Sequence, residues 1–388
     1  MTPLRNAAKA FGICAAIVLF TAASVAQENR VEPLAAFQKL DPSGITVSGI
    51  SSGAFFAHQF HVAYSSLVKG VGLVAGGPYA CADNADSITP PFNNPFFVAA
   101  VPRRVVAALA ECTTFGRDDF KKQGWGFPDQ PKASDSQAAA ARQQAAGKID
   151  DPANLAGSRV WLFHGDKDTI VPQATIQALK EFYQLMGVPA ANIQEVDGPD
   201  AQHGMPIDAL AAGAKTHCDP PEKSYLVKCD YGAAERLLPY LYPGAASQTP
   251  AAPGRIVRFD QTPFFDTHDD QTSLNSYGYL YVPKACENDA QSSQPCRLHV
   301  AFHGCEQYAA KIHDLFAREA GYDPWADAHN IIVLYPQATK WVRVTDPSEL
   351  SANPQGCWDW WGYSGSGYLG RDGKQMRAIR AMIGRLLP

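Results

Sequence analysis

The sequence lacks the surplus of positive charge that nucleic-acid-binding proteins carry. Its 33 Lys and Arg residues stand against 38 Asp and Glu residues, a formal net charge of -5. Two of the 33 basic residues, Arg5 and Lys9, belong to a predicted leader, which leaves 31 against 38 and a net charge of -7 for the mature chain. This balance excludes an extended basic surface, so we expect no nucleic-acid partner.

Long apolar runs are also scarce, and the one that is present lies near the N-terminus. It follows Arg5 and Lys9 and ends at the small residues "ASVA", 23–26. This pattern predicts a secretory signal peptide over residues 1–26, because the run is short for a membrane span and small residues mark a cleavage site. The mature chain, residues 27–388, is expected to be secreted, either periplasmic or extracellular, with no membrane contact after cleavage.

Zinc-binding patterns are absent, since the sequence has neither a CxxC pair nor a His-rich tract. One of the nine cysteines, Cys14, lies in the predicted signal peptide, and the even number left in an exported chain indicates disulfides. Buried free thiols are the alternative. The simplest of many connectivities joins near neighbours: Cys81 with Cys112, Cys218 with Cys229, Cys286 with Cys296, and Cys305 with Cys357.

Short apolar runs that end in Gly or Pro recur along the chain and indicate strands. Helical segments lie between many of them; after Ser51, the spacing of Phe56, Phe60 and Ala63 predicts an amphipathic helix. Strands that alternate with helices predict an α/β fold with a mostly parallel central sheet flanked by helices. The expected strands are 45–50, 70–76, 159–165, 192–198, 255–259, 277–283, 297–304 and 330–336.

Two segments have a biased composition. Residues 243–254 are rich in Pro, Ala and Gly, carry no charge, and divide the chain into halves with four expected strands each. We interpret them as a linker, with an ordinary long surface loop as the alternative. Residues 134–151 predict an exposed Ala-rich helix, to which we assign no chemistry.

Residues 49–53, Gly-Ile-Ser-Ser-Gly, match the G-x-S-x-G pattern of a nucleophile elbow. In such an elbow a strand turns sharply into a helix and exposes the serine hydroxyl, and the flanking glycines permit the strained backbone. Ser51 lies between a predicted strand and a predicted helix, as the motif requires. It is therefore the candidate nucleophile, and the N–H of Ser52 is expected to contribute to an oxyanion hole. The alternative is a Gly/Ser-rich turn without chemistry.

A serine nucleophile needs a histidine to accept its proton and a carboxylate to orient that histidine. In α/β-hydrolases the chain order is Ser, then acid, then His. Asp168 follows the strand expected at 159–165, and His203 lies on a Gly/Pro-rich loop further along, so the order is met. Asp166 is the weaker candidate for the acid, since it suits a turn. Three other histidines of this half, His58, His61 and His164, are expected to be structural.

The second N–H of the oxyanion hole normally comes from a loop that precedes the nucleophile, after the third strand of the fold. Too few mature residues precede Ser51 to supply that loop. The second half does contain an apolar strand that ends in His303-Gly304-Cys305, followed by a helix and another strand. The two halves are therefore expected to be exchanged in order, as a circularly permuted α/β-hydrolase fold with its junction near 243–254.

Several segments together resemble the circularly permuted, single-domain poly(3-hydroxybutyrate) depolymerases. The most specific are "AFHGC" and "NPQGCWDWWGY"; the others are "GISSGAFFAHQFHVAYS", "GGPYAC", "LFHGDKDTIV" and "WADAHNIIVLYPQ". The resemblance covers most of the mature chain. It implies a single α/β-hydrolase domain, a triad of Ser51, Asp168 and His203, and an oxyanion hole from the N–H groups of Ser52 and Cys305. It also implies a Cys305–Cys357 bridge that fixes one loop to the other, and no metal or cofactor.

For the substrate, the resemblance implies poly(3-hydroxybutyrate) or its oligomers. No separate polymer-binding module is recognised, which favours oligomers or amorphous granules over crystalline polymer. The alternatives are a carbohydrate esterase of the feruloyl or acetylxylan type and a catalytically silent binding protein. Trp358 and Trp361 are expected in the wall of the substrate cleft, with a core position as the alternative. An alternating backbone would point Trp358 and Trp360 to one side and Trp361 to the other.

Overall fold

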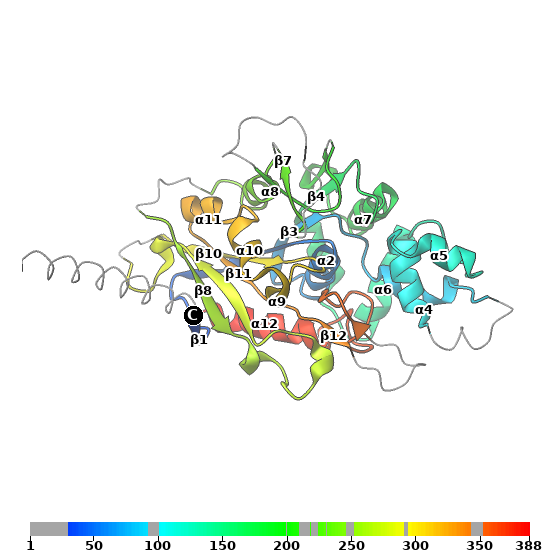
Figure 1. Ribbon diagram of the computed structural model, residues 1–388. Coiled ribbons are helices and arrows are strands. Elements are labelled where there is room, and N and C mark those ends of the chain that lie inside the picture. The colour runs from blue at the N-terminus through cyan, green and yellow to red at the C-terminus, as the bar shows by residue number, and fades with distance from the viewer. Residues whose placement is uncertain are drawn as a thin grey trace, which may run out of the picture.

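The computed structural model describes residues 30–91, 101–198, 200–208, 218, 224–229, 231–245, 252–290, 294–342 and 352–388. The predicted signal peptide and the middle of the predicted linker lie outside these residues. A nine-stranded sheet with the order β1-β8-β9-β11-β10-β2-β3-β4-β5 runs through the molecule, and helices flank it (Figure 1). The prediction of an α/β fold is therefore confirmed.

Each of the eight expected strands is present in this sheet, within a few residues of its predicted bounds. The inner ones form because β-branched and aromatic residues in buried runs suit a sheet covered by helices, whereas those at 193–198 and 255–260 are partly exposed. All neighbours in the sheet are parallel except β9, which runs antiparallel to β8 and β11. The strands are β2 (Leu40–Ile50), β3 (Val68–Val74), β4 (Arg159–Gly165), β5 (Ile193–Gly198), β8 (Arg255–Asp260), β9 (Tyr277–Val282), β10 (Cys296–Phe302) and β11 (Ile331–Tyr335), with the short edge strand β1 (Val31–Glu32).

The register between β10 and β2 determines where the two halves of the chain meet. Phe302, at the end of β10, pairs with Gly49, near the end of β2. Because the strands are parallel, the loop that follows β10 and the turn that follows β2 leave the sheet side by side. Ligands of open α/β sheets bind at such carboxyl ends.

Besides β1, four short strands of the described residues were not predicted. β6 (Met205–Asp208) and β7 (Leu226–Cys229) form a parallel pair, and β12 (Trp341–Val342) and β13 (Ala352–Asn353) form an antiparallel pair. Runs of two to four residues contain too little periodicity to be recognised in a sequence. The β6–β7 pair matters for the site because β6 begins two residues after His203.

The helix after Ser51, α2 (Ser52–Ala63), was predicted to be amphipathic, and this prediction is wrong. All 12 of its residues are buried. The sheet covers one side of the helix, and residues 358–361, which we call the Trp-rich segment, cover another. The rings of Phe55 and Trp360 are 4.1 Å apart, and those of Phe56 and Trp358 are 5.0 Å apart. A helix buried on all sides needs no polar face.

The remaining helices include one group that stands apart from the sheet, at the right of Figure 1. It comprises α4 (Arg103–Val106), the π-helical turn 107–112, α5 (Arg117–Lys122) and α6 (Ala133–Ala145). We call residues 101–132, which contain all of these except α6, the cap. The cap has a small core of its own around Val106, Ala110 and Trp125. The predicted Ala-rich helix is α6, which buries one face against the body. The others are α7 (Gln173–Leu185), α8 (Ala233–Leu241), α9 (Ala309–Ile312), α10 (Leu315–Glu319), α11 (Asp323–His329) and α12 (Lys374–Leu386).

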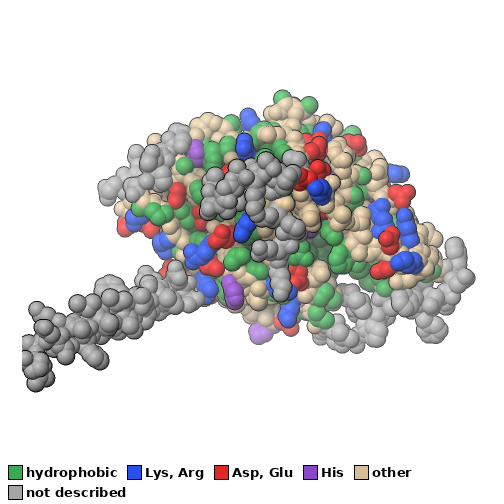
Figure 2. All heavy atoms as spheres, turned by 45° about the horizontal axis from the view of Figure 1, so that its top comes forward, with side chains coloured by type: hydrophobic (Ala, Val, Ile, Leu, Met, Phe, Trp, Pro, Cys, Tyr) green, Lys and Arg blue, Asp and Glu red, His purple; other side chains and the backbone are tan. Residues whose placement is uncertain are grey.

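Four disulfides join the cysteine pairs that the sequence analysis favoured: Cys81–Cys112, Cys218–Cys229, Cys286–Cys296 and Cys305–Cys357. The first ties the cap to the segment that follows β3. None of the helices formed by the described residues has the length and apolar character needed to cross a lipid bilayer. On the described part of the face in Figure 2, basic side chains are interspersed with acidic ones rather than gathered into a patch.

Candidate active site

Ser51 occupies a strained turn between β2 and α2. Its φ of 54° and ψ of -124° place it outside the conformations that side-chain-bearing residues usually adopt. The two flanking glycines are required by close packing. A Cβ on Gly49 would lie 2.3 Å from the carbonyl of Gly53, and a Cβ on Gly53 would lie 2.3 Å from the carbonyl oxygen of His303. The local structure is that of a nucleophile elbow.

The structure brings Ser51, His203 and Asp168 together in one hydrogen-bonded chain. Ser51 Oγ lies 3.0 Å from His203 Nε2, and His203 Nδ1 lies 2.8 Å from Asp168 Oδ2. The second carboxylate oxygen, Oδ1, accepts the N–H groups of Ile170 at 2.8 Å and Val171 at 3.0 Å. Three segments that are distant in sequence thus present a hydroxyl, an imidazole and a carboxylate in the order that nucleophilic catalysis uses.

The electrostatic environment keeps Asp168 ionised. Its side chain is only 1% exposed, and this burial would raise its pKa, but the hydrogen bond from His203 and the two backbone N–H groups outweigh burial and lower the pKa. An ionised carboxylate holds His203 with its proton on Nδ1 and leaves Nε2 free to accept the serine proton. Asp166 is exposed, and the hydrogen bond to His203 belongs to Asp168.

The loop after β10 lies against the elbow. A Cβ on Gly304 would be 3.5 Å from Ser51 Cβ. The N–H of Gly304 donates to Gln307 Oε1 at 2.6 Å, and the N–H of Glu306 donates to the Gln355 carbonyl at 2.7 Å. Between these two, the N–H of Cys305 has no acceptor within the described residues, nor has the N–H of Ser52 at the start of α2. Two backbone donors are therefore available beside Ser51.

His303 was named at the end of a predicted strand in the sequence analysis but was given no role, although it fixes the geometry of this loop. Its Nε2 accepts the N–H of Ala338 at 3.1 Å, so its proton is on Nδ1, which donates to the Gly304 carbonyl at 2.7 Å. Burial lowers the pKa of His303 to about 4, so the ring stays neutral. Because C=O and N–H point in opposite directions across a trans peptide, this bond directs the Cys305 N–H away from the His303 ring.

A cavity of about 410 Å³ opens above Ser51, a size that suits a small organic ligand. The elbow, the loop after β10 and the segment 352–361 form part of its wall, and the cap closes it with mostly apolar side chains. The cap residues were missed by the sequence analysis, because isolated apolar side chains on short helices carry no motif. They are Val105, Ala108, Leu109, Thr113 and Phe115.

Trp358 is not in the wall of the cavity, which corrects the prediction for this residue. It is fully buried, and its ring lies 5.0 Å from that of Phe302 and 5.4 Å from that of His303. Trp361 does line the cavity, and so does Trp360. The expected alternation fails because the segment is a turn: the Asp359 carboxylate accepts N–H groups from residues 362, 363 and 364.

His58, His61 and His164 are held by contacts with surrounding residues, which fits the structural role expected for them. His58 Nδ1 lies 3.0 Å from the Gly77 carbonyl, and His164 Nε2 lies 3.1 Å from the Val171 carbonyl. Both ring nitrogens of His61 contact hydroxyl groups, those of Tyr183 and Ser158. Burial lowers the pKa of His58 to about 4 and that of His61 to about 3.

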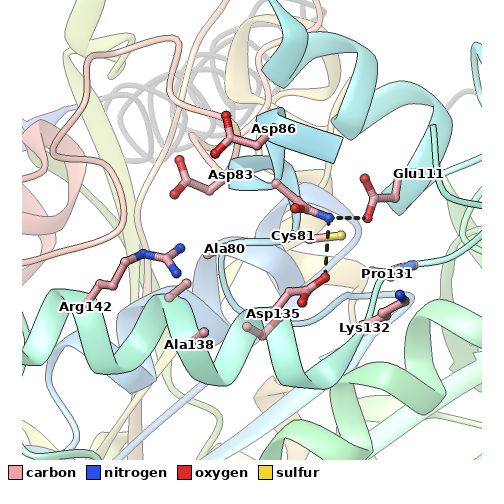
Figure 3. A pocket seen from close by; sticks show the side chains of 13 residues that line it. Ala80, Cys81, Asp83, Asp86, Glu111, Pro131, Lys132, Asp135, Ala138 and Arg142 are labelled. Carbon is pink, nitrogen blue, oxygen red and sulfur yellow. Dashed lines mark hydrogen bonds between the residues drawn. The ribbon is translucent and has the colours of Figure 1, made fainter. Parts of the chain in front are cut away.

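A second cavity, of about 440 Å³, lies between α6 and the cap (Figure 3). Its wall carries the carboxylates of Asp83, Asp86, Glu111 and Asp135, and the dashed lines mark hydrogen bonds from Asn84 to Glu111 at 3.2 Å and to Asp135 at 3.5 Å. No histidine is among its described lining residues, and no described group of three His, Cys, Asp or Glu side chains is arranged to hold a metal ion. This cavity offers no serine–histidine chemistry.

Replacing Glu111 with glutamine should make the protein more stable at alkaline pH. Burial raises the pKa of Glu111 from its ordinary 4.5 to about 7, so the folded state binds a proton that the unfolded state releases. This contribution to stability is fully present below about pH 4.5 and is lost as the pH rises through about 7. At about pH 8, Glu111→Gln should raise the free energy of unfolding by about 1–2 kcal/mol.

The measurement is urea unfolding of both proteins at about pH 5 and about pH 8. Glu181→Gln, at an exposed position on α7, is the matched control and should follow the parent at both values. If the difference in the free energy of unfolding between the parent and Glu111→Gln is the same at both pH values, the raised pKa of Glu111 is contradicted.

No protein-family model matches the chain. It is 34% identical over 351 residues to a poly(3-hydroxybutyrate) depolymerase of Delftia acidovorans, a match that covers 90% of this chain and 60% of that protein. It is 31% identical over 353 residues to a polyhydroxybutyrate depolymerase of Talaromyces funiculosus, covering 90% of this chain and 91% of that one. The chain thus spans less than two thirds of the Delftia protein and most of the Talaromyces protein.

Two solved structures are similar over almost their whole length. They are a PHB depolymerase from Penicillium funiculosum and a PHB depolymerase complexed with an R3HB trimer. Each shares a TM-score of 0.70 and 29% sequence identity with the chain, and each match covers 92% of this chain and 98% of the other.

Proposed function

The chain belongs to the family of poly(3-hydroxybutyrate) depolymerases, and on this basis we propose that it is an exported serine esterase that hydrolyses poly(3-hydroxybutyrate) or its oligomers. The observation that carries the proposal is the hydrogen-bonded chain of Ser51, His203 and Asp168 at the base of a largely apolar cavity. Apolar walls suit a polyester whose repeating unit bears a methyl group and no charge.

In the proposed reaction, Ser51 Oγ attacks the ester carbonyl carbon while His203 Nε2 accepts the hydroxyl proton. The charge that develops on the carbonyl oxygen is stabilised by the N–H groups of Ser52 and Cys305, and losing one such donor typically costs about 2.7–4 kcal/mol. The carbon–oxygen bond to the leaving alcohol then breaks, and His203 returns the proton to that oxygen. Asp168 stabilises the imidazolium throughout.

The second half of the proposed reaction releases the acyl group from Ser51. Water takes the place of the leaving alcohol, gives a proton to His203 Nε2 and attacks the acyl carbonyl. The same two N–H groups stabilise the second oxyanion. Collapse of this intermediate breaks the bond to Ser51 Oγ, which regains its proton from His203, and a carboxylic acid leaves.

We also propose that the α/β-hydrolase fold is circularly permuted. With the short edge strand β1 left out, and counted from β8 and continued through β2, the other eight strands of the sheet run 1-2-4-3-5-6-7-8. The candidate nucleophile then follows strand five and the loop of Cys305 follows strand three. Near the two ends of the described chain, the N–H of Phe37 donates to the Leu386 carbonyl at 2.9 Å. In Figure 1 the C-terminus lies beside β1. Adjacent ends are what a permutation requires.

Export is supported by the four disulfides, because such bonds persist in oxidising compartments. We propose that the predicted signal peptide, residues 1–26, directs this export.

The test of the proposed substrate uses amorphous poly(3-hydroxybutyrate) granules and purified mature protein. We expect soluble 3-hydroxybutyrate and its oligomers, identified by mass, and no release after treatment with a fluorophosphonate probe that modifies Ser51. If the protein cleaves p-nitrophenyl butyrate but releases nothing from granules or oligomers, it is an esterase and the proposed polyester substrate is wrong. Feruloylated and acetylated xylan would then be the substrates to assay.

A further inference from the structure

Glu306 holds an unusual backbone conformation directly after Cys305. Its φ of 64° is in the left-handed region, which few residues other than glycine, asparagine and aspartate adopt. Its N–H is fixed by the Gln355 carbonyl at 2.7 Å. Strain of this kind is retained where the surrounding structure enforces it, and it is concentrated at functional sites. Glu306 is one of the residues that line the cavity above Ser51.

Glu306 dominates the charge inside this cavity. Of the described residues that line it, Glu306 alone carries a carboxylate, and none carries an ammonium or guanidinium group. Lys311 binds the Glu306 carboxylate at 2.6 Å, but it approaches from outside the wall. The Lys311 side chain is 46% exposed, against 23% for Glu306, so solvent screens the ammonium more than the carboxylate.

The position of charge on the proposed substrate is fixed by its chemistry. A linear 3-hydroxyalkanoate chain has one free carboxylate, and this group is always on the alcohol side of the ester bond that is cleaved. For the bond nearest that end, the carboxylate belongs to the same hydroxyacid as the leaving oxygen, so it must enter the cavity. When a bond further from that end is cleaved, the free carboxylate stays farther from Ser51.

We propose that Glu306 is a specificity-determining residue that disfavours cleavage of the ester bond next to a free carboxylate end. This inference rests on the proposed function and extends it to the choice of bond. A second negative charge near Glu306 is repelled, whereas an internal repeat unit is neutral and meets no such penalty. The enzyme therefore favours bonds away from the carboxylate end and uses the free dimer poorly.

The experiment compares the free-acid dimer of 3-hydroxybutyrate with its methyl ester, which differs only in the charge. In the parent, kcat/KM should be lower for the acid, and the gap should narrow at high ionic strength. Glu306→Gln should raise the ratio of acid to ester on the order of fivefold, because a carboxylate in the cavity then meets only the Lys311 ammonium. Lys311→Met should lower this ratio.

Two controls make the result decisive. Glu319→Gln, at an exposed position on α10, should leave the ratio unchanged, and unfolding curves of each variant confirm that it is folded. If the parent hydrolyses both compounds and Glu306→Gln leaves the ratio unchanged, this inference is overturned while the proposed function stands. If the parent hydrolyses neither the dimer, nor its methyl ester, nor the polymer, both are overturned.

Discussion

Replacing Ser51 with alanine should reduce kcat for ester hydrolysis about 10⁶-fold, as loss of the nucleophile does in serine proteases. The reason is that the whole hydrogen-bonded chain acts on one atom. Without Oγ, His203 Nε2 has no proton to accept, and the charge on Asp168 has no imidazolium to stabilise. The measurement is kcat with p-nitrophenyl butyrate and with soluble 3-hydroxybutyrate oligomers.

The neighbouring serine provides the matched control for this experiment. Ser52→Ala removes a hydroxyl but keeps the backbone N–H that the proposed oxyanion hole uses, so most of the activity should remain. Alanine at position 51 faces the same positive φ as serine, and the fold should therefore be preserved. Normal hydrolysis by a folded Ser51→Ala protein would disprove the mechanism.

Asp168→Asn should lower kcat about 10⁴-fold near neutral pH, and the structure shows why the loss should be this large. Oδ1 accepts two backbone N–H groups, from Ile170 and Val171. An asparagine must place its carbonyl oxygen there, which turns its amide N–H₂ toward His203 Nδ1. The imidazole then accepts at Nδ1 and carries its proton on Nε2, the atom that has to take the proton of Ser51.

This argument predicts a loss in kcat with little change in KM, since Asp168 does not line the cavity. Asp166→Asn is the matched control, two residues away and exposed, and it should retain full activity. A similar loss in both variants would instead indicate a general effect of charge on this loop.

The sequence was most informative where local chemistry and chain order determine the structure. Gly49 and Gly53 cannot bear a Cβ at this turn, so the elbow is recognisable from five residues. Asp168 follows β4 and His203 follows β5, so both come after strands that end at the same edge of the sheet. The exchange of the two halves was also expected from the order of the motifs, and it stays a proposal.

Other features depend on contacts between segments that are distant in sequence. The direction of Trp358 is set by the carboxylate of Asp359, which bends the backbone into a turn. The burial of α2 on every side depends on rings contributed from about 300 residues further along. The role of His303 depends on Ala338, which follows the next strand. Single-residue patterns contain none of this information.

The Cys305–Cys357 bridge has a consequence for when the enzyme becomes active. One of the two proposed oxyanion donors is the backbone of a cysteine whose side chain is covalently tied to the Trp-rich segment. A newly made chain in a reducing compartment has two thiols there, and hydrogen bonds to His303, Gln307 and Gln355 hold the loop without the covalent link. If the protein is exported and uses this oxyanion hole as proposed, it reaches full catalytic power only after oxidation, and its precursor is a weaker threat to the esters of the producing cell.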